Sequence, residues 1–385
     1  MTQKQARTPD AKDVVGPQVL TLLSNVELGG IAVQARGLAI ELLQRGIATE
    51  LLLLSDQLGP GEMNWYSQVI PTRVASDNIL KTSGLRRFVN WFRYFRTMPE
   101  QIVHFHSMSQ EYIYWQAVLA ARAAGKSVVV TLHHTVNWNR SDRLGLFAQR
   151  LAWLAADALI VTTHASKTLI CQRVPSSKVE VIPCGISVQV PTKSRLDARK
   201  CFKYTEDDFV VIAAGRISRY KGFFDLLKSV EELSSSFPCI KLLIAGNGQD
   251  FEELSRCAQG KSYVQLAGRV ENLSDVIVAG DVFAMPSYEE GFGLVYGEAG
   301  LLGLSSIGGR LAQVEEVILD GETGWLVTPG DVSELKLVLS RLVVDRGKCR
   351  EAGRRAERHC RKFEMSEVVD QLESLYHRKF ASRWG

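Results

Sequence analysis

The 385-residue chain lacks the features that mark secreted, membrane-spanning or disulfide-linked proteins. It contains no run of 18 apolar residues, the length from which a membrane helix is inferred. The polar start Met1–Asp10 has no apolar signal region. Its seven cysteines are odd in number and scattered, without a Cys-x-x-Cys pair. We therefore expect reduced thiols in a cytoplasmic protein, with residues 1–16 disordered, and neither a disulfide framework nor a zinc site.

A large excess of one charge is also missing. Lysine and arginine number 46 against 42 aspartate and glutamate residues, which gives a formal net charge of +4. This mild balance tolerates an anionic substrate or an anionic bilayer surface, but it does not indicate a nucleic-acid-binding protein. No Asp-x-Asp sequence occurs, and no carboxylate or cysteine accompanies the histidines at metal-ligand spacing. We therefore expect no metal cofactor.

What is present is an alternation of short β-rich runs with helical patterns, which is typical of parallel sheets. Hydrophobic residues make up 46% and charged residues 23% of the chain, and its length suits two α/β domains. Periodicity predicts a first helix at Ala32–Arg45. The predicted strands are Val19–Leu23, Ala48–Ser55, Ile102–Phe105, Ser127–Leu132, Ala158–Thr162, Val179–Ile182, Phe209–Ala214, Lys241–Ala245, Val264–Leu266 and Val282–Met285.

The polar segment Ser187–Lys200, which contains Pro191, is interpreted as the link between the domains. The expected fold class is thus α/β, with two Rossmann-like domains facing a central cleft. The expected domains are residues 17–188 and 201–365, with a C-terminal helix at 366–385 that returns to the first domain. Open parallel sheets bind ligands at the carboxyl ends of their strands, so candidate site residues are sought there.

The most informative stretch reads Pro-Ser-Tyr-Glu-Glu-Gly-Phe-Gly-Leu-Val-Tyr-Gly-Glu-Ala. It places Glu290 and Glu298 with seven residues between them, at the point where a strand gives way to an apolar helix at Leu294–Leu302. Gly291 and Gly293 allow the backbone to approach a ligand closely, and the amides of a helix N-terminus attract an anion. The spacing is about two helical turns, so both carboxylates can face one side.

This block resembles the signature of the retaining, nucleotide-sugar-dependent glycosyltransferases of family 4, which have the two-domain GT-B fold. The likeness extends from about residue 20 to about residue 330. It implies that Glu290 contacts the hydroxyls of the donor sugar and that Glu298 holds the ribose of the nucleotide. The amides of this turn would help to orient the nucleotide sugar, and its residues are Gly291, Phe292, Gly293 and Leu294.

Two basic residues follow the strand at Phe209–Ala214 and are similar to the family's Gly-Arg…Lys-Gly block. Arg216 offers a planar two-pronged donor and Lys221 a compact charge, so the two can bracket a departing diphosphate. Arg219 is a further cation in the same loop, outside the family pattern. The resemblance also implies that relatives hold the base through the backbone of the block that is here Gly268, Arg269 and Val270.

In the first half, Gly29 and Gly30 follow the first strand and open a helix. Paired glycines there can form a phosphate-cradling turn or an ordinary tight turn. The resemblance favours a place beside the donor phosphates or the acceptor. The sequence is not Gly-x-Gly-x-x-Gly, so it offers little support for a nicotinamide cofactor.

Histidines end two strands of the first half. His133 matches the family's Thr-x-His pattern, which implies a catalytic place near the donor sugar, and His134 is the neighbouring alternative. His104 and His106 match a strand that relatives also end with His-x-His, and we interpret them as residues of the site wall.

The chain departs from the family pattern at several positions. Cys184 and Ser187 differ from the family's Ile-Pro-Asn-Gly-Val-Asp hinge, and Ser305 replaces a proline. No role is carried over to residues 304–315, because that region resembles the family only loosely. Asp320–Val327 resembles the family's closing hairpin.

The stretch Leu85–Arg96 combines four aromatic residues on one helical face with four arginines, and no acidic residue occurs between Asp77 and Glu100. Such a helix can contact an anionic membrane peripherally. Alternatively, its aromatic face packs against the domain's own sheet, which is the interpretation we favour.

The predicted function is transfer of a hexose from a UDP-, GDP- or ADP-sugar to an acceptor hydroxyl on a glycan or lipid-linked molecule. Family membership implies retention of anomeric configuration. It also associates the chain with bacterial surface polysaccharide, lipopolysaccharide or glycolipid biosynthesis at the inner face of the plasma membrane. Two alternatives stay open. One is a GT-B relative such as a nucleotide-sugar epimerase or a sugar phosphorylase, and the other is a degenerate protein that binds sugar nucleotides without catalysis.

Overall fold

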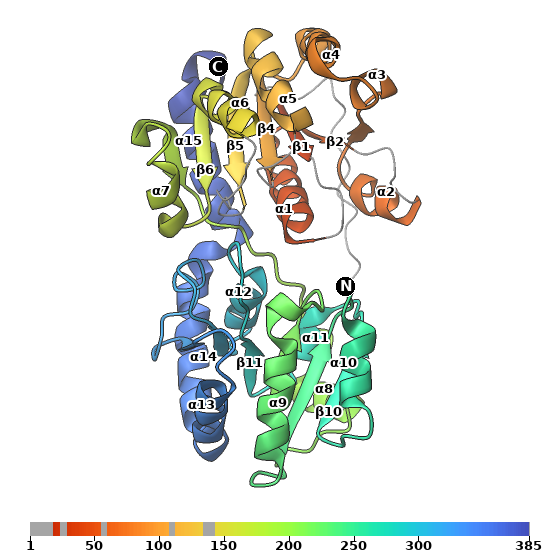
Figure 1. Ribbon diagram of the computed structural model, residues 1–385, viewed down its shortest axis with the longest axis vertical. Coiled ribbons are helices and arrows are strands. Elements are labelled where there is room, and N and C mark those ends of the chain that lie inside the picture. Colours follow the sequence, from red (N-terminus) through yellow and green to blue (C-terminus); the bar gives the residue numbers. More distant parts are fainter. Residues whose placement is uncertain (1–17, 24–28, 55–59, 108–111, 134–142, 385) are drawn as a thin grey trace. The chain divides into compact units, whose positions relative to one another are not determined.

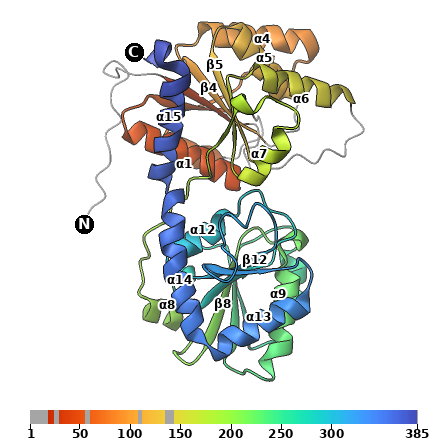
Figure 2. The same cartoon turned by 90° about the vertical axis from the view of Figure 1, so that its left-hand side faces the viewer.

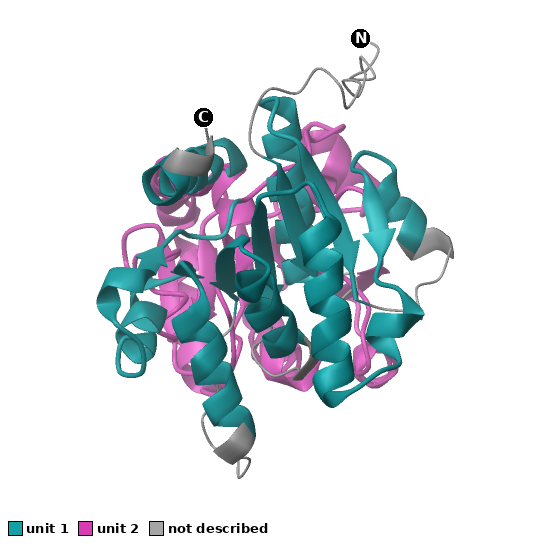
Figure 3. Ribbon diagram, turned by 90° about the horizontal axis from the view of Figure 1, so that it is seen from above, with its two compact units in different colours: residues 1–185, 365–385 teal, residues 186–364 magenta. Residues whose placement is uncertain are grey.

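The computed structural model describes residues 18–23, 29–54, 60–107, 112–133 and 143–384. The prediction of a disordered start at residues 1–16 falls outside these ranges. The chain forms two compact units, shown in separate colours in Figure 3. Unit 1 combines residues 1–185 with residues 365–385, and unit 2 consists of residues 186–364. The boundary thus lies at Gly185, before the expected end of the first domain at residue 188.

Unit 1 is built on a seven-stranded sheet with the order β3-β2-β1-β4-β5-β6-β7. Neighbouring strands are parallel throughout. The chain leaves β1 in one direction for β2 and returns on its other side as β4, which is the strand order of a Rossmann fold. The strands are β1 Val19–Leu23, β2 Thr49–Leu53, β3 Thr72–Val74, β4 Ile102–Ser107, β5 Ser127–Leu132, β6 Ala158–Val161 and β7 Val179–Val181.

Helices cover both faces of this sheet (Figures 1 and 2). Side chains of β5 alternate between the faces, so that Val128 and Val130 pack with α4, α5 and α6 while Val129 packs with α1 and α15. The C-terminal helix α15 lies beside α1 (Figure 2). The helices are α1 Gly30–Gln44, α2 Pro60–Ser67, α3 Asp77–Leu80, α4 Gly84–Thr97, α5 Tyr112–Ala123, α6 Arg143–Ala155, α7 His164–Ile170, the 3-10 helix η1 Ser176–Lys178 and α15 Met365–Trp384.

Unit 2 repeats the plan with a six-stranded parallel sheet of order β10-β9-β8-β11-β12-β13. Its strands are β8 Phe209–Ala214, β9 Ile240–Ala245, β10 Val264–Gly268, β11 Val282–Met285, β12 Ser306–Gly309 and β13 Gly324–Val327. Its helices are α8 Arg195–Cys201, η2 Arg219–Lys221, α9 Phe223–Ser234, α10 Phe251–Ala258, α11 Leu273–Ile277, α12 Leu294–Leu301, α13 Val332–Val344, α14 Arg346–Cys360 and η3 Arg361–Phe363. The prediction of two parallel-sheet α/β domains is confirmed.

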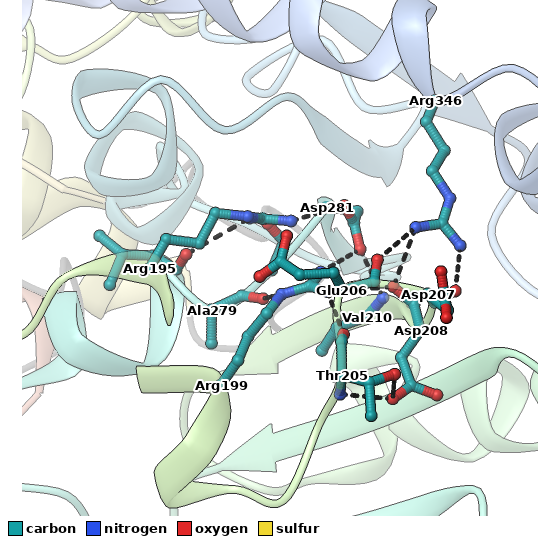
Figure 4. A network of polar contacts seen from close by, with 12 residues as sticks. Arg195, Arg199, Thr205, Glu206, Asp207, Asp208, Val210, Ala279, Asp281 and Arg346 are labelled. Carbon is teal, nitrogen blue, oxygen red and sulfur yellow. Dashed lines mark hydrogen bonds and ion pairs between the residues drawn. The ribbon is translucent and has the colours of Figure 1, made fainter. Parts of the chain in front are cut away.

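A buried ionic network fastens α8 to the amino-terminal edge of this sheet (Figure 4). Arg199 is 1% exposed, and its guanidinium donates to the carboxylate of Asp281 at 2.6 Å and to the carbonyls of Ala279 and Thr205 at 3.0 and 2.6 Å. The prediction of an interdomain link is therefore wrong for its second half, because positions 195–201 form the helix α8 of unit 2. The charged residues of this segment suggested a solvated linker, but their side chains have partners within unit 2.

A second correction concerns the expected hairpin at Asp320–Val327. The strand Gly324–Val327 is β13 and runs parallel to β12, after a turn in which the amide of Gly321 donates to the carbonyl of Gly324 at 2.8 Å. Gly324 is close-packed, because a Cβ on it would lie 2.2 Å from the carbonyl oxygen of Ser306. Residues 306–309, for which no role was assigned, form β12 in the core of the sheet. Within the described residues, no helix is both long and apolar enough to traverse a bilayer.

Candidate functional site

The carboxyl end of β11 leads into the turn that carries Glu290. β11 is buried along its length, and Ser287, just beyond it, is 0% exposed. Gly293 has a φ of +85°, and a Cβ there would lie 2.4 Å from the ring of Tyr296, so only glycine fits where the turn enters α12. The hydroxyl of buried Tyr296 donates to the carbonyl of Met285. The first turn of the helix is thereby fastened to the strand.

A neighbouring loop brings Lys221 to this turn. Gly222 has a φ of +75°, and a Cβ on it would lie 2.3 Å from the carbonyl oxygen of Pro286, so the two backbones touch without an intervening side chain. Lys221 Nζ lies 2.6 Å from Glu290 Oε1, and Ser287 Oγ donates to the same oxygen at 3.0 Å. The Lys221 and Glu290 side chains are only 17% and 7% exposed. This is a largely buried, charge-assisted contact.

The sequence assigned Lys221 and Glu290 to different parts of the donor, and the structure joins them in one cluster. Ser287 was not singled out. The sequence signal for Ser287 was its place in the Pro-Ser pair that precedes the motif. This signal does not identify a site residue, because a serine between a strand and a turn often serves only to shape the turn.

The other two cations of the loop differ in their surroundings. Arg216 follows the end of β8 and is exposed. The guanidinium of Arg219 forms an ion pair with Glu253, and its backbone amide donates to Asp250 Oδ2 at 2.8 Å. Arg219 is therefore engaged by α10 and its N-terminal turn, which fits its place outside the family pattern.

Glycines also bring together the carboxyl ends of β8, β9 and β10. A Cβ on Gly246 would lie 1.9 Å from the carbonyl oxygen of Gly215. The amide of Gly246 donates to the carbonyl of Gly268 at 2.7 Å, where the register between β9 and β10 shifts. Gly268 has a φ of +64°, which L side chains rarely adopt. Beyond it, Arg269 is exposed and Val270 is half-buried.

Glu298 lies on α12 and is half-buried. Within the described residues, its carboxylate has no hydrogen-bond or ion-pair partner. Burial raises the pKa of this carboxyl to about 7. A half-buried carboxyl without protein partners can accept hydrogen bonds from the hydroxyl groups of a ligand.

The glycine pair of unit 1 occupies the start of α1. Gly29 is the residue before the helix and has an extended conformation, and its carbonyl accepts the first helical bond from the amide of Val33 at 3.0 Å. Gly30 is exposed, and Gly29 at the N-cap position makes no side-chain bond to this end of the helix. The N-cap residue therefore leaves the amides of the first turn without a side-chain acceptor.

His104, His106 and His133 of unit 1 belong to a buried network. His133 is 5% exposed, its Nε2 lies 2.9 Å from Nδ1 of His106, and its Nδ1 lies 4.0 Å from the thiol of Cys184. Burial lowers the pKa of His106 well below its ordinary value, and the nearby His104 lowers it further. His106 is therefore a neutral imidazole in contact with His133. His134 lies outside the described residues.

His104 lies deeper and is contacted by the C-terminal helix. Its Nε2 lies 2.7 Å from the hydroxyl of Thr131, and its Nδ1 lies 2.7 Å from the hydroxyl of Tyr376 on α15. Burial lowers the pKa of His104 to about 3. The involvement of Tyr376 could not be found from sequence, because it lies 272 positions away from His104.

The helix α4 packs its aromatic face inward. Trp91 and Phe95 are 0% exposed, and Phe88 and Phe92 are partly buried against the same core. This is the arrangement favoured from the sequence. Leu85 at the start of the helix is 78% exposed.

Comparison with known proteins identifies the two halves separately. Residues 28–190 match the family described as Glycosyltransferase Family 4, and residues 195–359 match the family described as Glycosyl transferases group 1. An N-acetyl-alpha-D-glucosaminyl L-malate synthase of Bacillus anthracis is 25% identical over 68% of this chain and 71% of its own length. A D-inositol 3-phosphate glycosyltransferase of Mycolicibacterium smegmatis is 30% identical over 58% of this chain and 53% of its own length.

Solved structures share the fold. Anabaena HepE in complex with UDP superposes with a TM-score of 0.81 at 18% identity, covering 94% of this chain and 100% of that one. Sucrose-phosphate synthase from Thermosynechococcus elongatus superposes with a TM-score of 0.75 at 20% identity, covering 95% and 100%. This chain aligns with little more than half the length of several of its curated relatives, for example 53% of the Mycolicibacterium smegmatis D-inositol 3-phosphate glycosyltransferase.

Proposed function

The chain belongs to the family 4 glycosyltransferases with the GT-B fold, and we propose that it moves a sugar from a nucleoside-diphosphate sugar to an acceptor hydroxyl with retention of anomeric configuration. One observation carries the proposal. Lys221, Glu290 and Ser287 meet at the carboxyl ends of β8 and β11, and the motif's second carboxyl, Glu298, has no protein partner among the described residues. Ligands of parallel α/β sheets bind at these strand ends.

In the proposed mechanism, unit 2 binds the donor. Arg216 and Lys221 stabilise the charge that develops on the leaving diphosphate, since preorganised cations act most strongly where charge appears in the transition state. Glu290 fixes the sugar and Glu298 the ribose. The amides of residues 291–294 orient the donor, and the backbone of residues 268–270 holds the base.

Unit 1 contributes further candidate residues of the site. We place Gly29 and Gly30 beside the donor phosphates or the acceptor, and His133 near the donor sugar. His106 supports this assignment, because its contact with Nε2 fixes the orientation of the His133 ring. No residue is assigned as a covalent nucleophile.

The substrate class is proposed from relatives. HepE was solved with UDP-glucose. A GDP-mannose-dependent alpha-(1-6)-phosphatidylinositol monomannoside mannosyltransferase of Mycolicibacterium smegmatis is 28% identical over 59% of this chain and 63% of its own length. We propose a UDP-, GDP- or ADP-sugar as donor and a glycan or lipid-linked acceptor. The pathway would be surface polysaccharide or glycolipid synthesis on the cytoplasmic side of the membrane.

A thermal-shift panel of UDP, GDP, ADP and their common sugars tests the donor class. A ligand present at about 100 times its dissociation constant stabilises the folded protein by about 2.7 kcal/mol, and we expect one nucleotide series to do so. Nucleoside diphosphate should then be released only when acceptor is present. Release without acceptor would contradict transfer, and binding without any release would indicate a degenerate binding protein.

We also propose that the reaction needs no metal, because Arg216 and Lys221 already serve the diphosphate. Turnover should therefore persist in EDTA. Loss of turnover on chelation, restored by manganese or magnesium, would refute this part.

A further inference from the structure

Among the described residues, two side chains donate to the carboxylate of Glu290, and both reach the same oxygen. Lys221 Nζ and Ser287 Oγ lie 2.6 and 3.0 Å from Oε1. No hydrogen bond from the described part of the chain reaches Oε2. An ionised carboxylate offers about four acceptor positions on its two oxygens. The structure therefore leaves one oxygen of Glu290 for a ligand hydroxyl.

The two donors differ in what else they can do. Lys221 sits on a flexible four-carbon chain, and under the proposed function it also serves the donor diphosphate, so a bound diphosphate competes with Glu290 for its ammonium. Ser287 has no such freedom. It is 0% exposed, and its carbonyl is packed so closely on Gly309 that a Cβ there would lie 2.0 Å away. Its backbone is therefore fixed, and its hydroxyl remains beside Glu290 when Lys221 is drawn to the diphosphate.

We propose that Ser287 is a positioning residue that holds Glu290 toward the donor sugar while Lys221 engages the diphosphate. Selectivity for the nucleotide sugar over the free nucleoside diphosphate then depends on Ser287, although it touches neither ligand. This inference rests on the proposed function and adds a residue to it. A carboxylate that has lost both donors in a largely buried site would turn toward solvent, because an unpaired buried charge is costly.

Ser287→Ala tests the proposal through two dissociation constants measured by titration calorimetry. One is for the nucleotide sugar selected by the thermal-shift panel and the other is for its nucleoside diphosphate. A hydrogen bond to a charged group contributes about 1.5–3 kcal/mol, which corresponds to a factor of about 10–150. We expect nucleotide-sugar binding to weaken at least tenfold and nucleoside-diphosphate binding to change less than twofold.

Two further variants make the test specific. Ser287→Cys keeps a side chain of similar size with only a weak S–H donor, so it should lose most of the same selectivity, and it serves the measurement if Ser287→Ala does not fold. In a Glu290→Gln background, Ser287→Ala should cause little additional loss, because the two residues act as one unit.

Ser305→Ala is the matched control. Ser305 is also a 0% exposed serine of unit 2, and its hydroxyl has no hydrogen-bond partner among the described residues. Both dissociation constants should keep their wild-type values in this variant. Equal weakening of both ligands by Ser287→Ala would show a merely structural role, and unchanged selectivity would also overturn the inference. A wild-type protein that binds no nucleotide sugar would instead refute the proposed function.

Discussion

The protonation of Glu298 provides a quantitative test of the donor site. Its pKa of about 7 in the ligand-free protein means that the carboxyl is mostly neutral at pH 6 and mostly ionised at pH 8. Ribose hydroxyls donate more strongly to a carboxylate than to a neutral acid. Binding should therefore favour the ionised form and release a proton at low pH.

The size of the effect follows from the ionised fraction. With a pKa of about 7, about one molecule in eleven is ionised at pH 6 and about ten in eleven at pH 8. If only the carboxylate binds ribose well, nucleotide-sugar affinity should rise about tenfold over this range. A tenfold change is about 1.4 kcal/mol of binding free energy.

Titration calorimetry between pH 6 and pH 8 checks this expectation. The nucleotide sugar should be used as ligand, because its phosphates are diesters and do not titrate in this range. Buffers of different ionisation enthalpy would report the released proton. Glu298→Gln should bind more weakly at pH 8 and show no pH dependence, and Glu290→Gln should keep the wild-type slope. A flat wild-type profile, or a slope that persists in Glu298→Gln, would refute the assignment of Glu298 to the ribose.

Three other predictions address the diphosphate loop, the core of unit 2 and the acid response of unit 1. Lys221→Ala should lower turnover about 100-fold, which is the scale seen on loss of one preorganised donor. Arg219→Ala should change turnover little, because the charge of Arg219 is already paired with Glu253. Equal losses of turnover in the steady-state kinetics of the two variants would contradict the assignment of Lys221 to the diphosphate. Arg199→Ala should lower the unfolding free energy of unit 2 by about 1–3 kcal/mol in urea titrations, because it leaves the carbonyls of Ala279 and Thr205 without their donor and removes one partner of Asp281, which keeps its contact with Arg195. A variant as stable as the wild-type protein would disprove this. Because the folded pKa values of His104 and His106 are lowered, unit 1 should lose stability as pH falls below about 6.5, by about 2 kcal/mol between pH 6.5 and 5.5 for the two groups. A Tm of unit 1 that does not change over this range would be inconsistent with neutral buried imidazoles.

Several parts of the fold were determined by local sequence. The strands at Val19–Leu23, Ser127–Leu132, Phe209–Ala214 and Val282–Met285 were predicted with the bounds that the structure has. Each is rich in apolar residues without regular alternation, because a strand in a parallel sheet is covered on both faces. Short or weakly apolar strands escaped prediction, as β3 at the sheet edge and the Gly-containing β12 illustrate.

The family and the main candidate residues also followed from sequence. Glu290, Glu298, Arg216 and Lys221 belong to compact motifs whose spacing is local, so no knowledge of the tertiary structure was needed to find them. Their roles in the reaction stay predictions until the measurements above are made.

Only the tertiary structure decided which side chains meet. The Lys221–Glu290 contact joins residues 69 positions apart, and it exists because Gly222 lets one strand-end loop touch the next. In the same way, Tyr376 reaches His104 across 272 positions because the C-terminal helix returns to unit 1. Sequence periodicity reports burial and local spacing, whereas the pairing of distant strand ends depends on sheet order and on close backbone approaches that residue types alone do not specify.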